Sequence, residues 1–370
     1  IAQVQSYDLA AAVARVRQAQ ASATIAGAAL LPELNGNFGA TRHGRLGGDG
    51  NGTPSGTVYQ AGLTASYELD FWGRNRAVRD SARADLRAAE FDRDTVHLTV
   101  TAGVATAWLQ TMGLRERVAI ADLSVASAQR LLDVIESRAR AGAANPLELA
   151  QQRGVLAAQM RARAAIRQQA EDSQTTLAVL LGRNPSLLSL AVTDLKSLQA
   201  PTTGAGLPAD LLTRRPDIAR AEAQLARADA NVIAARAAML PRITLGGDMT
   251  AASNRVSSVF DNPVYSLAAG LAAPIFNAGR LAAGRDLALA QREELLANYR
   301  RAIVAAFGDV ETAFNAVAGI DAQRTAQAEE LRQAQRAFNL AESRYRAGAE
   351  TSLTLLDAQR TLYAAQDAAA

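Results

Sequence analysis

The chain of 370 residues repeats part of its own sequence at a fixed offset. The pattern Gly73-Arg74-x-x-Ala77-x-Arg79-Asp80 returns as Gly279-Arg280-x-x-Ala283-x-Arg285-Asp286, and Ser137-Arg138-x-Arg140-Ala141-Gly142 returns as Ser343-Arg344-x-Arg346-Ala347-Gly348. Both pairs lie 206 positions apart, since 279 − 73 and 343 − 137 are equal. A register kept without insertion over about 70 residues is typical of a continuous helix, so the sequence predicts a duplicated, mostly helical unit.

Proline placement predicts where the long helices run. No proline lies between Pro54 and Pro146, and none follows Pro274. We therefore expect helices over 72–140 and 278–346, each roughly 100 Å long at 1.5 Å per residue. Small or apolar residues recur at steps of three and four along both, which favours coiled-coil packing. These positions are Val125, Ala128, Leu132, Ile135 and Ala139 in the first helix and Leu331, Ala334, Phe338, Ala341 and Tyr345 in the second.

Each long helix is predicted to end at an Arg-Ala-Gly-Ala tip, because Gly142 and Gly348 suit the left-handed residue that closes a helix. A further helix follows each tip, over 146–182 and 352–370, and the pairs form two tight helical hairpins. The segments at about 31–71 and about 240–277 are rich in Gly, Asn, Thr and Ser and read as one β-hairpin per repeat. Their strands have about the ten residues that a tilted transmembrane strand needs.

The predicted organisation is a first repeat over 1–182, a linker over 183–209 and a second repeat over 210–370. Near the start, Asp8-Leu9-Ala10 matches Asp217-Ile218-Ala219, so the chain opens within a repeat. We expect an N-terminal segment, including any signal, to have preceded it.

Composition argues against several functional classes. Cysteine is absent, which removes disulfides and thiolate chemistry. The 39 basic and 36 acidic residues are intermixed, which gives no case for nucleic acid. No run approaches 18 apolar residues, so we expect no transmembrane helix.

The possible chemical sites are weak. His43, in an expected Gly-rich loop, and His97, on a long helix, lack the partners of a metal site. Asp92 and Asp94 read as a solvated helix face rather than an acid/base pair. The segment 47–52 lacks the Lys-Ser/Thr of a phosphate loop and reads as a hairpin turn at the extracellular rim. We expect no enzyme activity and no cofactor.

Several motifs carry a resemblance to a known family. They are Glu68-Leu69-Asp70-Phe71-Trp72-Gly73-Arg74 at the strand-to-helix junction, Leu211-Leu212-Thr213-Arg214-Arg215-Pro216-Asp217-Ile218 at the start of the second repeat, and Leu355-Leu356-Asp357-Ala358-Gln359-Arg360 after the second tip. With the duplicated order of elements, they resemble the TolC-like outer-membrane factors, and most closely the lipoprotein branch that serves resistance-nodulation-division (RND) multidrug pumps. The acylated N-terminal cysteine of that branch is absent, and the last helix stops early, at Ala370.

The resemblance implies a homotrimer in the Gram-negative outer membrane. Three protomers would contribute four strands each to one β-barrel of twelve strands, contacting outer-membrane lipid, and their helices would continue it as a periplasmic tunnel. Two hairpins alone cannot span a bilayer, because open strand edges in lipid leave backbone groups unpaired. The implied partners are a periplasmic adaptor (membrane fusion) protein and an inner-membrane RND-type transporter. The implied function is a passive exit duct for drugs or other small molecules, with a lipid anchor on the full-length precursor.

The resemblance also implies three sets of site residues. Leu353, Asp357 and Arg360 fall where the family narrows its periplasmic aperture. The tip residues Gly142, Ala143, Gly348 and Ala349 are the expected adaptor docking points. Phe71, Trp72, Gly73, Arg74, Gly279 and Arg280 mark the strand-to-helix junctions. From spacing alone, Asp357 and Arg360 could instead form an exposed intrahelical pair.

Two alternatives remain open from the sequence. The chain could be a soluble coiled-coil scaffold or adaptor whose Gly-rich segments are only loops. The same fold could also serve type I protein secretion or metal-ion efflux.

Overall fold

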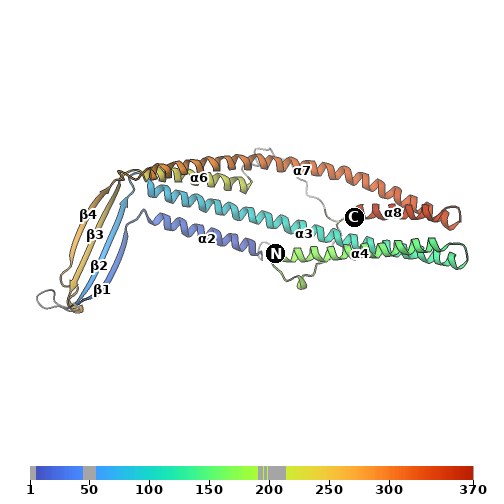
Figure 1. Ribbon diagram of the computed structural model, residues 1–370, viewed down its shortest axis with the longest axis horizontal. Helices are drawn as coiled ribbons and strands as arrows, with labels where there is room; N and C mark the ends of the chain where they lie inside the picture. The colour runs from blue at the N-terminus through green and yellow to red at the C-terminus, as the bar shows by residue number, and fades with distance from the viewer. Residues whose placement is uncertain (1–5, 45–55, 191–194, 196–197, 199–213, 370) are drawn as a thin grey trace. The chain divides into compact units, whose positions relative to one another are not determined.

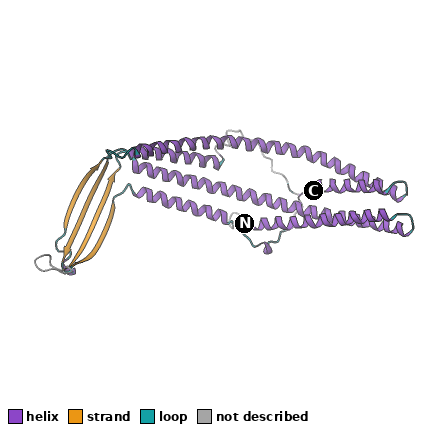
Figure 2. Cartoon of the chain, in the orientation of Figure 1, coloured by secondary structure: helices purple, strands orange, loops and turns teal. Residues whose placement is uncertain are grey.

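The computed structural model describes residues 6–44, 56–190, 195, 198 and 214–369. Within these ranges the chain is mostly helical with one small sheet (Figures 1 and 2). The helices are α2 (Tyr7–Ala28), α3 (Arg74–Arg140), α4 (Pro146–Leu180), α6 (Pro216–Ala237), α7 (Arg280–Arg346) and α8 (Ser352–Ala369), with short 3-10 turns η1 (Pro185–Leu187) and η3 (Val256–Ser258). The strands are β1 (Glu33–His43), β2 (Gly56–Leu69), β3 (Arg242–Ser253) and β4 (Val264–Ala272).

The structure tests some of the expectations for the loops and the linker. His43 is the last residue of β1 and pairs with Gly56, so the expectation that it lies in a loop was wrong. Small and polar residues alternate as far as His43, so the strand extends to this residue. The hairpin turn expected at 47–52 and most of the linker at 183–209 lie outside the described residues.

The chain folds as two compact units. The sheet unit comprises residues 11–95 and 208–304, and the tip unit comprises residues 1–10, 96–207 and 305–370. Each unit takes residues from both sequence repeats, because α3 and α7 each contribute to both. The units therefore do not follow the division into repeats, which stays a prediction.

The four strands of the sheet unit form one antiparallel sheet in the order β1-β2-β3-β4 (Figure 2). Each hairpin pairs within itself, and β2 pairs with β3 to join the two repeats. The outer strands β1 and β4 have no neighbour on their far sides among the described residues. The sheet is therefore open, with two unpaired edges.

The helices α3 and α7 have the same length, 67 residues each. Both end in the same way. Gly142 and Gly348 adopt φ of 74° and 75°, and the next residue in each case donates its backbone N–H to the carbonyl of Arg138 or Arg344. This is the Schellman arrangement, in which a left-handed residue satisfies the last helical carbonyls. The chain then reverses, and α4 begins at Pro146 with Asn145 as its N-cap.

The core of the tip unit is a seam between the two helical hairpins. Leu131 and Ile135 of α3 pack with Phe338 of α7 and with Leu355 and Leu362 of α8. The seam positions expected from the sequence are buried or half-buried on both long helices. A second, smaller cluster joins Leu177 and Leu188 with Ala107 and the partly buried Trp108. Many of the other buried positions are alanines, which let helices approach closely.

One stretch of α7 is rich in apolar residues. α7 contains an 18-residue window with mean hydropathy 1.3, which is long and apolar enough to cross a membrane by length and composition alone. Only 6% of that window is buried within the chain. The expectation that the chain has no transmembrane helix stays a prediction, since interspersed alanines raise the mean hydropathy of this window without forming an uninterrupted apolar run. Exposed large side chains on this part of α7 include Val304, Phe314, Val317 and Ile320.

Candidate functional site

The register of the sheet sorts its residues onto two chemically different faces. Successive side chains of a strand point to opposite faces, so residues in one row of the register share a face. One face carries mainly polar or small residues, including Asn35, Asn37, Thr64, Asp248, Thr250 and Ser266. The other carries Leu34, Phe38, Tyr59, Leu63, Tyr67, Leu245, Met249, Tyr265, Leu267 and Leu271. Most large side chains on this second face are exposed, which is typical of a sheet whose apolar face meets lipid.

Contacts across the strands confirm this division. A side chain at Gly62 would meet Asn37 and Thr250 of the polar face, and Ser266 hydrogen-bonds Asp248 on the same face. On the apolar face, a side chain at Gly247 would meet Leu267. Because lipid offers no hydrogen-bond partners, the open edges of β1 and β4 must be paired with strands of other chains.

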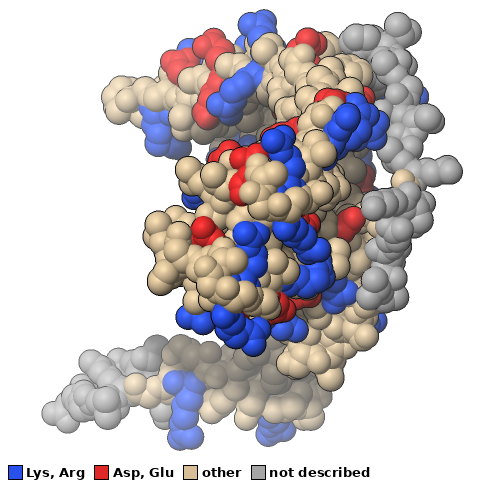
Figure 3. All heavy atoms as spheres, turned by 90° about the vertical axis from the view of Figure 1, so that its right-hand side faces the viewer, with Lys and Arg blue, Asp and Glu red and all other residues tan. Residues whose placement is uncertain are grey.

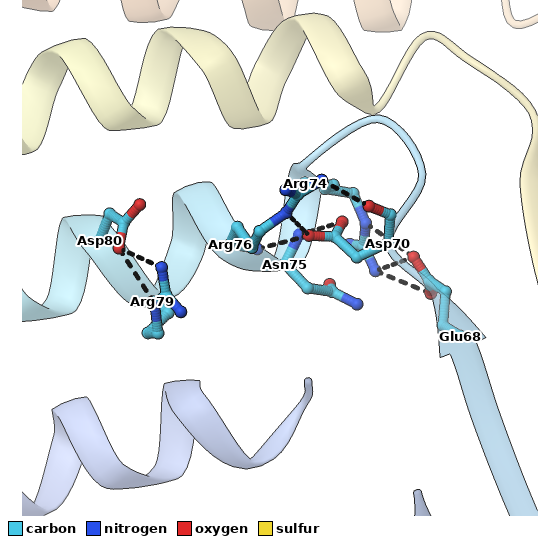
Figure 4. Close-up of polar contacts among 7 residues, drawn as sticks. All are labelled: Glu68, Asp70, Arg74, Asn75, Arg76, Arg79 and Asp80. Carbon is cyan, nitrogen blue, oxygen red and sulfur yellow. Dashed lines mark hydrogen bonds and ion pairs between the residues drawn. The ribbon is translucent and has the colours of Figure 1, made fainter. Parts of the chain in front are cut away.

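The junction between β2 and α3 is held by two carboxylates (Figure 4). Glu68 accepts hydrogen bonds from Arg74 Nη2 at 3.0 Å to each of its oxygens. Asp70 accepts the backbone N–H groups of Asn75 and Arg76, both at 2.8 Å, and so caps the first turn of α3. Trp72 Nε1 donates to the carbonyl of Pro241 at 2.7 Å, which ties this junction to the start of β3.

The Asp70 carboxylate is held in its ionised form. Burial of the side chain would raise its pKa, but the hydrogen bonds from Arg76 and Asn75 and the Arg76 guanidinium together lower the pKa below its ordinary value. Only 8% of this side chain is exposed. Asp70 therefore contributes to stability mainly as an anion at a helix N-terminus.

The second junction is more lightly built. Asn277 Oδ1 accepts the backbone N–H of Leu281 at 3.2 Å, and Arg280 makes no ion pair within the described part of the chain. Gly279 adopts φ of 80° at the helix start, as Gly73 does with 77° in the first repeat. Phe71 lies edge-on to Trp72, with ring centroids 4.8 Å apart, so the aromatic residues gather at the first junction.

The predicted gate residues share one face of α8. Leu353, Asp357 and Arg360 are all exposed and are spaced four and three apart, which places them on one side of the helix. The opposite side carries the buried residues Leu355, Gln359 and Leu362. No ion pair joins Asp357 to Arg360 among the described residues, so the intrahelical pair that the spacing allowed does not form.

A bridge that the sequence analysis missed connects three helices of the tip unit. The Arg138 guanidinium lies 4.6 Å from the Tyr345 ring centroid and donates to the Tyr345 carbonyl at 2.6 Å. The Tyr345 hydroxyl donates to Glu148 Oε2 at 3.0 Å. Burial, and then the Glu148 carboxylate, raise the pKa of Tyr345. One signal was present in the sequence: Tyr345 replaces the Ala139 of the first repeat and so breaks the repeat.

The two helical hairpins are joined internally by different means. In the first, Gln152 of α4 is fully buried and its Nε2 donates to the Ala128 carbonyl of α3 at 3.1 Å. The equivalent Gln359 of α8 is also fully buried, but it donates to Tyr363 Oη within its own helix at 2.8 Å. Neither Oε1 atom has a hydrogen-bond partner among the described residues. The sequence already shows that Gln152 and Gln359 are equivalent, since they lie 207 positions apart, one more than the repeat offset of 206.

The polar contacts of α8 lead to α3 rather than to α7. Arg117 Nη2 donates to both carboxylate oxygens of Asp367, at 2.8 and 2.9 Å, and Ser124 donates to Gln366 at 3.4 Å. Among the described residues, no side-chain hydrogen bond or ion pair joins α8 to α7. By contrast, α3 and α4 are linked by Arg163–Asp122, Arg153–Glu136 and Thr111–Ser173. The α7–α8 hairpin is thus held mainly by apolar contacts.

The charge distribution offers no concentrated site. Figure 3 shows acidic and basic side chains interspersed over the face that it presents. Within the described ranges, no three His, Cys, Asp or Glu side chains lie together in a group that could hold a metal ion. Asp92 pairs with Arg220, and Asp94 pairs with its neighbour Arg93, so neither carboxylate belongs to an acid/base pair.

Known proteins that are similar to this chain identify its family. The sequence profile of the outer membrane efflux proteins matches residues 1–183 and 207–370. The chain belongs to the outer membrane efflux protein family. It is 52% identical to the pyoverdine export outer membrane protein OpmQ of Pseudomonas aeruginosa, over 99% of this chain and 79% of the relative.

Other relatives and a solved structure agree with this assignment. The cation efflux system protein CusC of Escherichia coli K12 is 31% identical over 98% of this chain and 79% of its own. A crystal structure of CusC covers 99% of this chain and 85% of its own, with a TM-score of 0.90 and 31% identity. The probable outer membrane lipoprotein SilC of Salmonella typhimurium is 32% identical over 97% of this chain and 78% of its own.

These findings confirm the fold class and the general function. The protein is an outer-membrane channel of a tripartite efflux pump and not an enzyme. As in its structural neighbours, three protomers form the channel, so the four-stranded sheets close into a barrel of twelve strands that the helices continue as a tunnel. The family works with an adaptor and an inner-membrane pump. The alternative of a soluble scaffold was wrong, because the apolar sheet face and the open edges need lipid and other strands.

Proposed function

We propose that the chain is a passive exit duct whose periplasmic end is closed by Leu353, Asp357 and Arg360. The observation that carries the proposal is their common exposed face on α8, opposite a face that is buried in the core of the tip unit. In a trimer, one exposed Asp357 becomes a ring of three carboxylates. Exposed charges without side-chain partners among the described residues suit a ring formed between chains.

The hydrogen-bond pattern supports a movable α7–α8 hairpin. Its helices lack polar links to each other among the described residues, whereas α3 and α4 are linked repeatedly. A hairpin held by apolar contacts can slide with little loss of directed bonds. The Arg138–Tyr345–Glu148 bridge and the Arg117–Asp367 ion pair then hold the movable hairpin to α3 and α4 in the closed state.

The two helical tips are the proposed docking points for the periplasmic adaptor. Gly142 and Gly348 adopt left-handed conformations, and added side chains there would meet nothing within 4 Å. With Ala143 and Ala349 beside them, the tips present backbone that another helix can approach closely. Docking beside the bridge at Tyr345 would give the adaptor a route to the gate.

The electrophysiology of one variant tests the gate. Asp357→Ala is expected to raise the conductance of the closed trimer in planar bilayers several-fold, because it removes the charged ring without touching a buried side chain. Asp133→Ala, which changes an exposed carboxylate on α3, serves as the control and should leave the conductance unchanged. Equal conductance of Asp357→Ala and the parent trimer would contradict the gate.

For the cargo, we propose a small organic metal chelator of the pyoverdine kind. The support is the 52% identity with OpmQ, against 31% and 32% with CusC and SilC over nearly the same length. Independently of the cargo, the motifs shared with the RND-serving branch support a cognate pump of the RND type, and the resemblance to SilC supports a lipid anchor on the full-length protein. Metal-ion efflux is the second candidate, because CusC is named for it.

Complementation separates these cargoes. In a Pseudomonas aeruginosa strain lacking OpmQ, this chain with its native leader is expected to restore the secreted pyoverdine measured in the medium. An Escherichia coli strain lacking CusC provides the second arm, with tolerance to added metal cations, copper among them, as the readout. Restoration of metal tolerance without restoration of pyoverdine export would overturn the proposed cargo in favour of metal ions.

A further inference from the structure

The apolar face of the sheet contains one defined groove of about 430 Å³. It lies across β1, β2 and β3. Its lining side chains from this face include Phe38, Leu63 and Met249, and the loop between β3 and β4 adds Phe260 and Pro263. The lining is mostly apolar, and the whole groove belongs to the sheet unit.

The groove exists because small residues meet where the loop folds back. Ala61 and Ala251 are register partners on the apolar face, and both are buried although most of that face is exposed. Val259 of the same loop is 1% exposed, so the loop is packed down rather than extended into solvent. Large side chains around this pair of alanines leave a hollow.

Two arginines without partners stand at the same end of the sheet. Arg42 lies on the apolar face, four residues beyond Phe38 along β1, and Arg255 lies two residues beyond the end of β3. Arg42 has no hydrogen bond or ion pair to another described residue, and the Arg255 guanidinium has none either. By contrast, Arg74 and Arg76 at the opposite end of β2 are paired with Glu68 and Asp70.

The level of these arginines matches a membrane interface. Tyr59 pairs with Ala40 and Ser253, so it stands on the apolar face near the hairpin ends, whereas Tyr265 pairs with Met249 and lies level with the groove. Tyrosine rings mark the level of lipid headgroups in transmembrane barrels. Arg42 lies beyond Tyr59, at headgroup level, while the groove lies below it, at acyl-chain level.

We propose that this groove and the two arginines form a binding site for lipopolysaccharide. An acyl chain of lipid A fills the groove, and a lipid A phosphate accepts charge-assisted hydrogen bonds from Arg42 and Arg255. The proposal commits to lipopolysaccharide rather than phospholipid because the strand ends that carry the helices lead to the periplasm. The hairpin ends therefore face the outer leaflet, where lipopolysaccharide is the lipid. The site is continuous with the lipid-facing wall and rests on the family's membrane location, not on the proposed gate or cargo.

Native mass spectrometry of the purified trimer in detergent tests the site. Rough lipopolysaccharide and phosphatidylglycerol are added in separate titrations. The double variant Arg42→Gln with Arg255→Gln is expected to bind lipopolysaccharide about tenfold more weakly, since it loses charge-assisted bonds to a phosphate. Ala251→Leu places a larger side chain in the groove. It is also expected to weaken lipopolysaccharide binding about tenfold, since the acyl chain can no longer be buried there.

Matched controls separate the site from general effects. Arg242→Gln changes an arginine on the polar face at the other end of β3, and Ala269→Leu adds the same bulk to the apolar face of β4 outside the groove. Both should bind lipopolysaccharide like the parent trimer. Variants are compared only where trimer content and circular dichroism match the parent.

Three outcomes overturn the proposal. The first is parental binding of lipopolysaccharide by both site variants. The second is equal weakening by the control variants, which would indicate a general loss of lipid contact. The third is phosphatidylglycerol binding as tightly as lipopolysaccharide and with the same dependence on Arg42 and Arg255, which would assign the site to phospholipid.

Discussion

Tyr345→Ala is expected to destabilise the tip unit by about 3–5 kcal/mol, the cost of removing a large buried aromatic side chain. Tyr345 is 3% exposed and packs in the seam with Phe338 and Leu355. The change also removes the bond to Glu148 and the ring beneath Arg138. We expect a lower melting temperature of the trimer and, where the trimer survives, a higher closed-state conductance.

Tyr345→Phe isolates the bridge from the packing. It keeps the ring and loses the hydroxyl bond to a carboxylate, a change of about 1.5–3 kcal/mol at most. Tyr363→Phe is the matched control, since the hydroxyl that it removes is hydrogen-bonded, among the described residues, to Gln359 of its own helix. Conductance should rise with Tyr345→Phe and not with Tyr363→Phe, and a rise in neither variant would remove the bridge from the closing mechanism.

The raised pKa of Tyr345 gives the same bridge a pH dependence. Because the folded-state pKa lies above the unfolded value of about 10, the neutral phenol contributes its stability fully below that pH. The contribution is lost as pH rises through the folded-state pKa. The parent trimer should therefore lose more stability than Tyr345→Phe on passing into strongly alkaline solution.

Asp70→Ala is expected to cost about 2 kcal/mol of stability at neutral pH, because it removes a charged cap from two backbone N–H groups. The site begins a helix of 67 residues and fixes the direction in which α3 leaves β2. Thermal unfolding of the detergent-solubilised trimer measures the effect. Asn277→Ala, at the lighter second junction, should cost less, since Asn277 caps one N–H at 3.2 Å.

The sign of the pH dependence at Asp70 is opposite to that at Tyr345. The folded-state pKa of Asp70 lies below the ordinary 3.8, so its contribution is present above that value and is lost as pH falls through the folded-state pKa. The difference in melting temperature between the parent and Asp70→Ala should be full at pH 7 and shrink below about pH 4. A difference that stays constant down to pH 2 would show that the charge of Asp70 is not what stabilises the junction.

The exposed apolar surface of α7 fits the assembled channel. A helix in the wall of a trimer contacts neighbouring chains as well as its own, so large apolar residues that are exposed in one chain can be buried in three. Val317 and Ile320 are examples. Membrane-like hydropathy in this helix is thus compatible with a periplasmic position.

The positions of the helices, their ends and the β-hairpins could be predicted from the sequence, because they depend on residues close together in the chain. Proline-free stretches that keep the repeat offset predict α3 and α7. The glycines of the Arg-Ala-Gly-Ala tips predict where these helices end. Both predictions succeed because helix periodicity and capping depend on residues within one or two turns. The hairpins followed from composition in the same way. The resemblance placed the gate residues on α8, but their function stays a prediction.

The sequence by itself thus determined a duplicated chain of long helices, tight tips and β-hairpins, and it placed Tyr345 on the helical seam. Tertiary structure alone decided what such residues contact. The pairing of Tyr345 with Glu148, the bond from Trp72 to Pro241 and the different partners of Gln152 and Gln359 join separate elements or distinguish equivalent ones. The two faces of the sheet were decided in the same way, because one residue of slip between β2 and β3 would exchange polar and apolar rows. Local periodicity fixes elements, whereas contacts between distant segments depend on a register that only the folded chain sets.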